Sequence, residues 1–247
     1  MSRTALVTGA SGGIGAAIAR RLASDGYAVI VGYNRSRDRA DAVVAELTGE
    51  GHRALRVDVL DADSLGDAAD HVVSTSGSLD VLVNCAGVTQ PVPHDDLDAL
   101  TDDVIDWIFH TNWRGPFATI RALRPALDKA ADPAAVVNIS SVAGVTGQGS
   151  NVAYCASKAA LDSMTRSLAR ALGPQIRVVS VSPGWVLGEY ASRMPREVLE
   201  TQERETPLGR LATPDDVAAA VSAVVGNLPF TTGSIISVDG GRPLGAS

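Results

Sequence analysis

Cysteine is scarce in this chain of 247 residues. Its two cysteines, Cys85 and Cys155, cannot build a disulfide scaffold, and neither has a histidine or cysteine neighbour at the spacing of a zinc site. We expect both as reduced, buried thiols. The four histidines also lack metal-ligand spacing, so no metal site is predicted from His52, His71, His94 and His110.

Positive charge and long apolar runs are lacking too. Lysine and arginine total 21 against 28 aspartates and glutamates, and the resulting net charge of −7 argues against a protein that coats nucleic acid. No apolar run approaches the roughly 18 residues of a membrane span, and the first residues show no signal-peptide pattern. We therefore expect a cytoplasmic protein that interacts with neither nucleic acid nor membrane.

The chain instead alternates short apolar runs with longer amphipathic stretches. Hydrophobic residues make up 45% of it and aromatic residues only 4%, so the core is expected to be aliphatic. The apolar runs predict buried parallel strands at 4–8, 28–32, 53–58, 81–84, 135–139, 177–182 and 235–238. The amphipathic stretches predict helices at about 14–25, 37–49, 62–76, 101–128, 152–172 and 213–225. This alternation is typical of an α/β fold.

Neither a linker nor a repeat interrupts the pattern. Residues 1–247 are therefore expected to form one domain. The charged segment 188–207 separates a predicted strand from the next helix, and long loops at such positions often cover active sites. We expect it to form a substrate lid.

A glycine-rich turn follows the first predicted strand and opens the first predicted helix. It reads Thr8-Gly9-Ala10-Ser11-Gly12-Gly13-Ile14-Gly15. Glycines let a pyrophosphate approach the backbone, and the start of the helix offers free N–H groups and the positive end of its dipole. A turn in this strand-to-helix context predicts a dinucleotide site.

The glycine spacing and several later segments resemble those of the short-chain dehydrogenase/reductase family over essentially the whole chain. These segments are Asn84-Cys85-Ala86-Gly87, Asn112, Ser140-Ser141, Tyr154-Cys155-Ala156-Ser157-Lys158, Pro183-Gly184 and Val238-Asp239-Gly240-Gly241. The resemblance implies a doubly wound Rossmann-type domain whose seven-stranded parallel sheet has the order 3-2-1-4-5-6-7, with helices on both faces. It also implies an oxidoreductase.

The predicted catalytic residues lie in three of these segments. Tyr154 and Lys158 are four positions apart on a predicted helix, so they share one face. An ammonium group favours the phenolate, which suits Tyr154 as general acid in reduction and general base in oxidation. Ser141 ends a predicted strand and can donate to the substrate oxygen as negative charge develops there. The resemblance assigns this role to Ser141 rather than Ser140, a ribose contact to Lys158, and the anchoring of a relay water to Asn112.

The residues after the second predicted strand indicate the cofactor. Asn34-Arg35-Ser36 carries no carboxylate, and Arg35 can bind a 2′-phosphate with help from Ser36. NADP(H) is therefore predicted, with NAD(H) as the alternative, although many NADP-dependent relatives carry a basic residue where this chain has Gly12. The resemblance implies cofactor contacts by Gly9, Ser11, Gly12, Gly13, Ile14, Gly15, Asn34, Arg35, Ser36, Asp58, Val59, Asn84, Ala86, Gly87, Tyr154, Lys158, Pro183, Gly184 and Val186.

Residues 138–144 and 207–211 resemble 3-oxoacyl-(acyl carrier protein) reductases of fatty acid biosynthesis. The resemblance thus implies reduction of a ketone, on a small molecule or a thioester, with acyl carrier protein as a candidate partner. Two alternatives stay open: an enzyme of a sugar, polyol or cyclic alcohol or ketone, and a non-catalytic NADP-sensing protein. Trp185 would narrow the pocket mouth, and Gly188 replaces the threonine that holds the carboxamide in the family. A homotetramer built through helices 101–128 and 152–172 is also implied.

Overall fold

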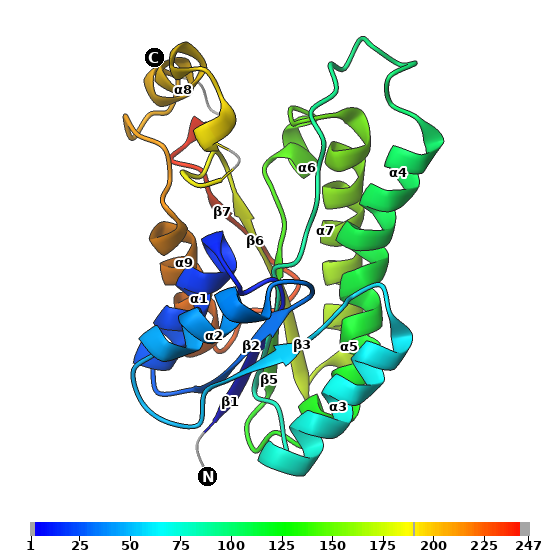
Figure 1. The fold of residues 1–247 in the computed structure, drawn as a ribbon, viewed down its shortest axis with the longest axis vertical. Coiled ribbons are helices and arrows are strands. Elements are labelled where there is room, and N and C mark those ends of the chain that lie inside the picture. The colour runs from blue at the N-terminus through cyan, green and yellow to red at the C-terminus, as the bar shows by residue number, and fades with distance from the viewer. Residues whose placement is uncertain (1–2, 190, 243–247) are drawn as a thin grey trace.

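The computed structural model describes residues 3–189 and 191–242 as a parallel sheet with helices on both faces (Figure 1). The strands follow the order β3-β2-β1-β4-β5-β6-β7, which confirms the predicted sheet. Their bounds are β1 Thr4–Val7, β2 Ala28–Tyr33, β3 Arg53–Arg56, β4 Val81–Asn84, β5 Ala134–Ile139, β6 Ile176–Pro183 and β7 Ile235–Val238. Every neighbouring pair in this order is parallel.

Successive side chains of a strand point to opposite faces of the sheet and pack into two separate hydrophobic cores. Ala5 and Val7 of β1 pack into a cluster with α1 (Gly13–Ser24) and α9 (Pro214–Gly226). Leu6, between them, packs into a second cluster with α5 (Gly115–Leu127) and α7 (Val152–Leu172). Figure 1 shows these two helical layers on either side of the sheet. Because both faces are covered, the central strands are apolar throughout rather than alternating.

The remaining helices include two that the sequence pattern did not predict. The predicted ones are α2 (Arg37–Glu46), α3 (Ala62–Ser76) and α4 (Asp102–Phe109). The others are α6 (Ala143–Thr146), which has only four residues, and α8 (Arg196–Arg204), which lies inside the predicted lid after a short turn at Ala191–Arg193. None of the residues of α8 is buried, and only Val198 and Leu199 in it are apolar, so its sequence has too few apolar residues to predict a helix.

The prediction of one continuous helix at 101–128 is wrong in one respect. A π-helical turn, η1 (His110–Arg114), separates α4 from α5 and contains Asn112. Such turns often occur at functional sites, because the extra residue re-aims side chains while the helix continues. None of the described helices combines the length and apolar character needed to cross a membrane.

Candidate active site

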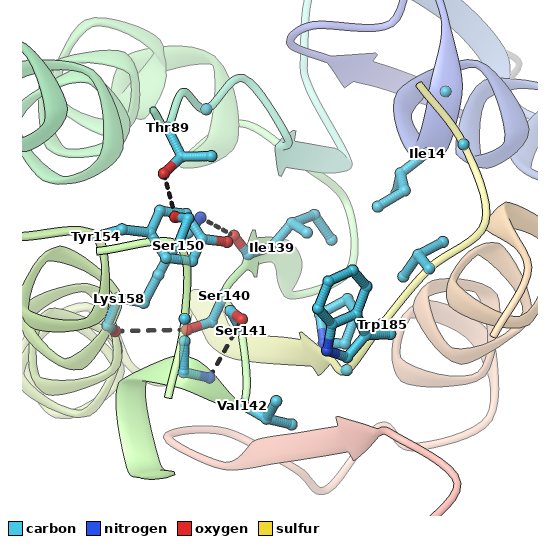
Figure 2. A pocket seen from close by; sticks show the side chains of 18 of the residues that line it. Ile14, Thr89, Ile139, Ser140, Ser141, Val142, Ser150, Tyr154, Lys158 and Trp185 are labelled. Atoms are coloured by element: carbon cyan, nitrogen blue, oxygen red, sulfur yellow. Dashed lines mark hydrogen bonds between the residues drawn. The ribbon is translucent and has the colours of Figure 1, made fainter. Parts of the chain in front are cut away.

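A cavity of about 600 Å³ opens at the carboxyl ends of the strands, where parallel α/β sheets bind ligands. Segments that follow β1, β4, β5 and β6 line it, together with the start of α7 and part of segment 188–207. Figure 2 shows Ser141, Tyr154 and Lys158 on one side and Ile14 and Trp185 on the other. The structure therefore brings the predicted glycine turn together with Ser141, Tyr154 and Lys158 in one cavity.

The glycine turn is fixed against the end of β4. The Thr8 hydroxyl accepts hydrogen bonds from the backbone N–H groups of Cys85 (3.0 Å) and Ala86 (3.1 Å). Gly9 has a φ of 66°, and a Cβ there would lie 3.0 Å from the Cα of Ala86. A Cβ at Gly15 would overlap the carbonyl oxygen of Gly9. The turn thus forms a close-packed cradle of bare backbone, which suits a pyrophosphate at the start of α1.

The loop before α7 fixes the start of the catalytic helix. The Asn151 side chain caps α7 by accepting from the Tyr154 N–H at 2.6 Å, and its amide donates to the Gln90 carbonyl at 2.7 Å. The Ser150 hydroxyl also bonds to that of Thr89. These hydrogen bonds join the segment after β4 to the helix of Tyr154, so the two cavity walls that they form are fixed relative to each other.

Lys158 is buried and reaches back to β5. Its Nζ donates to the Ile139 carbonyl at 2.9 Å and lies 5.7 Å from the centre of the Tyr154 ring. Burial lowers the pKa of Lys158 to about 8, opposed by nearby Cys85 and Asp162. Burial also raises the pKa of Cys85 to about 12, so this neighbour is a neutral thiol at pH 7. The positive charge of Lys158 therefore has little negative charge near it, and it lies beside Tyr154.

The two serines after β5 have different surroundings. The Ser140 hydroxyl is buried and donates to the Lys158 carbonyl at 3.4 Å. The half-buried Ser141 hydroxyl accepts from the Ala143 N–H at 3.2 Å, which leaves its own proton available for donation. The geometry therefore favours Ser141 as the hydrogen-bond donor to a ligand.

Asn112 does not line the cavity but supports its wall. From η1 its Oδ1 accepts from the Val88 N–H (2.8 Å) and its Nδ2 donates to the Val88 carbonyl (2.9 Å). A Cβ placed on Gly87 would lie 3.4 Å from this Oδ1 and 3.7 Å from Lys158 Nζ. Asn112 and Lys158 therefore lie near each other beside the bare backbone of Gly87, without a direct hydrogen bond between them.

The predicted cofactor residues divide into two groups. Those that line the cavity are Gly9, Gly12, Gly13, Ile14, Gly15, Gly87, Tyr154, Lys158, Pro183, Gly184 and Val186. Those outside it are Ser11, Asn34, Arg35, Ser36, Asp58, Val59, Asn84 and Ala86. Among the latter, Asn34 and Arg35 are exposed beyond β2, whereas Asn84 is buried and donates to the Asn138 side chain.

Two residues that line the cavity, Gln202 and Arg242, were not predicted from the sequence. Arg242, after β7, lines the cavity and binds the Gln202 side chain (3.1 Å) and the Glu205 carboxylate, both from the end of α8. This contact joins segments about 40 positions apart, so no local pattern could have predicted it. Trp185 lines the cavity as expected, and nothing lies within 4 Å of a Cβ placed on Gly188.

Over residues 3–189 and 191–242 no cluster of three or more histidines, cysteines, aspartates or glutamates could hold a metal ion. Both cysteines are free in the structure, Cys155 buried and Cys85 partly so.

Known proteins are similar to this chain over nearly its whole length. A family model described as enoyl-(acyl carrier protein) reductase matches residues 9–242. The chain is 38% identical to 3-oxoacyl-(acyl-carrier-protein) reductase FabG of Staphylococcus aureus, over 98% of each chain. It is 39% identical to cis-4-hydroxycyclohexanecarboxylate dehydrogenase of Sinomonas cyclohexanicum, over 97% of this chain and 96% of the relative.

Solved structures share its fold. A dehydrogenase/reductase from Sinorhizobium meliloti 1021 superimposes with a TM-score of 0.88 at 36% identity, over 97% of this chain and 94% of that one. A short-chain dehydrogenase/reductase from Brucella melitensis, titled a glucose/ribitol dehydrogenase, gives 0.90 at 30% identity, over 97% and 96%. The chain therefore belongs to the short-chain dehydrogenase/reductase family and is an oxidoreductase that acts on CH–OH or C=O groups.

Proposed function

We propose that this protein reduces a ketone to a secondary alcohol with NADPH, using Tyr154 as general acid, and catalyses the reverse oxidation with Tyr154 as general base. The observation that carries the proposal is that Ser141, Tyr154 and Lys158 line the same cavity as the glycine turn. A non-catalytic cofactor sensor would not need this set of side chains. The retained tyrosine and lysine therefore favour an enzyme.

Each side chain has a separate part in the proposed reaction. When bound, the nicotinamide cofactor supplies the hydride that reaches the carbonyl carbon. The Tyr154 hydroxyl gives its proton to the carbonyl oxygen, and the Ser141 hydroxyl donates a hydrogen bond to the same oxygen as it gains negative charge. The Lys158 ammonium stabilises the phenolate that remains. Asn112 holds the wall at Val88 and is proposed to anchor a water that returns a proton to this site.

The preference for NADP(H) rests on the end of β2. Asn34 and Arg35 are exposed there, Ser36 is partly so, and the first carboxylate after the strand is Asp38, within α2. The Ser36 side chain makes no capping hydrogen bond to α2, so its hydroxyl is available to a phosphate. These features favour a 2′-phosphate over a 2′-hydroxyl.

For the substrate we propose a 3-oxoacyl thioester carried by an acyl carrier protein. Similarity over the full length to a 3-oxoacyl-(acyl-carrier-protein) reductase supports this choice. The similar dehydrogenase of a cyclic hydroxy acid supports the second candidate, a cyclic alcohol or ketone. Trp185 favours this second candidate on steric grounds, because a flat aromatic wall suits a compact ring.

We also propose a cytoplasmic homotetramer. The free cysteines are in keeping with a reducing compartment. Trp113 of η1 and Phe117 of α5 are both partly exposed and stack with ring centres 6.2 Å apart. An exposed aromatic pair on the helix predicted to form the subunit interface supports assembly through that face.

Two measurements test the proposed function. NADPH oxidation is followed with acetoacetyl and crotonyl thioesters and with small ketones and sugars; the acetoacetyl thioester should turn over fastest. Faster turnover of a cyclic ketone would select the second candidate, and faster turnover of the crotonyl thioester would refute ketone reduction.

Tyr154→Phe should abolish turnover while the protein still binds NADPH, since only the transferable proton is lost. Near-normal turnover in that variant would refute the mechanism.

A further inference from the structure

Gly12 occupies a position in the glycine turn where its backbone does not require glycine. Its φ of 173° is extended, a conformation that any residue adopts. The space that a side chain would use is instead taken by Arg39. A Cβ placed on Gly12 would lie 3.6 Å from Arg39 Cζ and would overlap one terminal nitrogen of its guanidinium.

Arg39 reaches this place from the first turn of α2. The loop before α2 is held beside the glycine turn, since the Ala10 N–H donates to the Gly32 carbonyl at 2.8 Å. Helices α1 and α2 are also in contact and lie side by side in Figure 1. The guanidinium of Arg39 therefore lies over the bare backbone of the turn, close to the loop that carries Arg35.

Arg39 differs from the other arginine of the same helix turn in having no anionic partner. Arg37 pairs with Asp41 at 3.4 Å. Within the part of the chain that the structure describes, neither Arg35 nor Arg39 forms an ion pair. The guanidinium groups of Arg35 and Arg39 lie in neighbouring segments and repel each other, because neither has an anionic partner among the described residues. An anion bound between them would remove this electrostatic repulsion.

We propose that Arg39 is a second ligand of the cofactor 2′-phosphate and determines the preference for NADPH, with Gly12 providing the space for its guanidinium. The charge that many NADP-dependent relatives place within the turn would here come from α2. The inference rests on the proposed use of NADP(H) and extends it by naming a residue that reads the phosphate. A planar guanidinium can bind two phosphate oxygens at once, which makes arginine well suited to this part.

Dissociation constants for NADPH and NADH, measured by titration calorimetry without substrate, test the assignment. Arg39→Met keeps the apolar stem and removes the charge. We expect it to weaken NADPH binding about 10- to 100-fold, the range for one hydrogen-bonded charged group, and to change NADH binding less than twofold. Arg37→Met is the matched control on the same helix and should change both constants less than twofold. Unchanged NADPH affinity in Arg39→Met would overturn the proposal.

A double variant tests whether an arginine at position 12 can replace the arginine at position 39. Gly12→Arg in the Arg39→Met background returns a guanidinium to the turn, where the extended backbone accepts a side chain. NADPH affinity should recover to within about threefold of wild type. A double variant as weak as Arg39→Met would overturn the claim that the charge is needed over Gly12. Wild-type protein that binds NADH as tightly as NADPH would overturn the cofactor preference itself, a result distinct from the failure of Arg39 alone.

Discussion

We expect the buried charge of Lys158 to lower the free energy of unfolding, and the variant Lys158→Met measures the size of this effect. The pKa of its ammonium group is about 8 in the folded protein against 10.5 for a free lysine. Each tenfold change in proton affinity is worth about 1.4 kcal/mol, so keeping this group charged costs the folded state about 3 kcal/mol at pH 7. Methionine removes this cost but also leaves the Ile139 carbonyl without its 2.9 Å donor, a loss of about 1 kcal/mol.

The net expectation is that Lys158→Met is inactive yet about 2 kcal/mol more stable at pH 7. The unfolded chain holds the lysine proton more tightly than the folded one, so the cost is complete below pH 8 and shrinks as the pH rises toward 10.5. At pH 9 the advantage of the variant should therefore fall to about 1 kcal/mol.

Urea unfolding followed by circular dichroism at both pH values measures these differences. The chain has one other lysine, the exposed Lys129, so Lys129→Met is the matched control and should stay within about 0.5 kcal/mol of wild type. A Lys158→Met protein less stable than wild type at pH 7, or an advantage that does not change with pH, would refute the reasoning. With only two lysines, carbon-13 labelling of their side chains would also report the titration near pH 8 directly.

Three further outcomes follow from the geometry. Ser141→Ala should lower kcat about 100-fold in steady-state assays, whereas Ser140→Ala, on the buried side, should lower it less than tenfold; equal losses would contradict the assignment of the donor. Gly13→Ala should lower the free energy of unfolding by about 1 kcal/mol, because the φ of Gly13 is 54°. Gly9→Ala should lower it distinctly more, since its Cβ would also lie 3.0 Å from backbone atoms. Thermal unfolding that ranks the two variants the other way would contradict the packing described for Gly9. Thr213→Ala removes the capping box of α9 and should cost about 1 kcal/mol without altering kcat or KM, and a large kinetic effect would show that α9 reaches the site.

The sheet and the catalytic helix could be predicted because their signals are local. Each strand is a short apolar run, and Tyr154 and Lys158 share a helical face by spacing alone. The sheet order and the family are confirmed, whereas the roles of the site residues remain predictions.

What the sequence could not predict depends on distant contacts or on the absence of a pattern. The bond from Lys158 to Ile139 and that from Arg242 to Gln202 each join separate elements. Helix α8 contains only two apolar residues, Val198 and Leu199, so hydrophobic periodicity could not predict it. The position of Arg39 over Gly12 follows from how α2 packs beside the turn, and an arginine at that place in α2 has no distinguishing signal of its own.

The π-helical turn at His110–Arg114 makes chain length itself a constraint on the site. A π turn holds one residue more than the α-helical path, so it acts as a local one-residue insertion. Deleting one residue there would let α4 and α5 merge into a regular helix while both keep their orientation, because the wider π turn is what absorbs the extra residue. The apolar face of α5 would then stay in the core, whereas Asn112 would lose the wide turn that directs its side chain to Val88. The position of Asn112 therefore depends on the number of residues in this helix as well as on their identity.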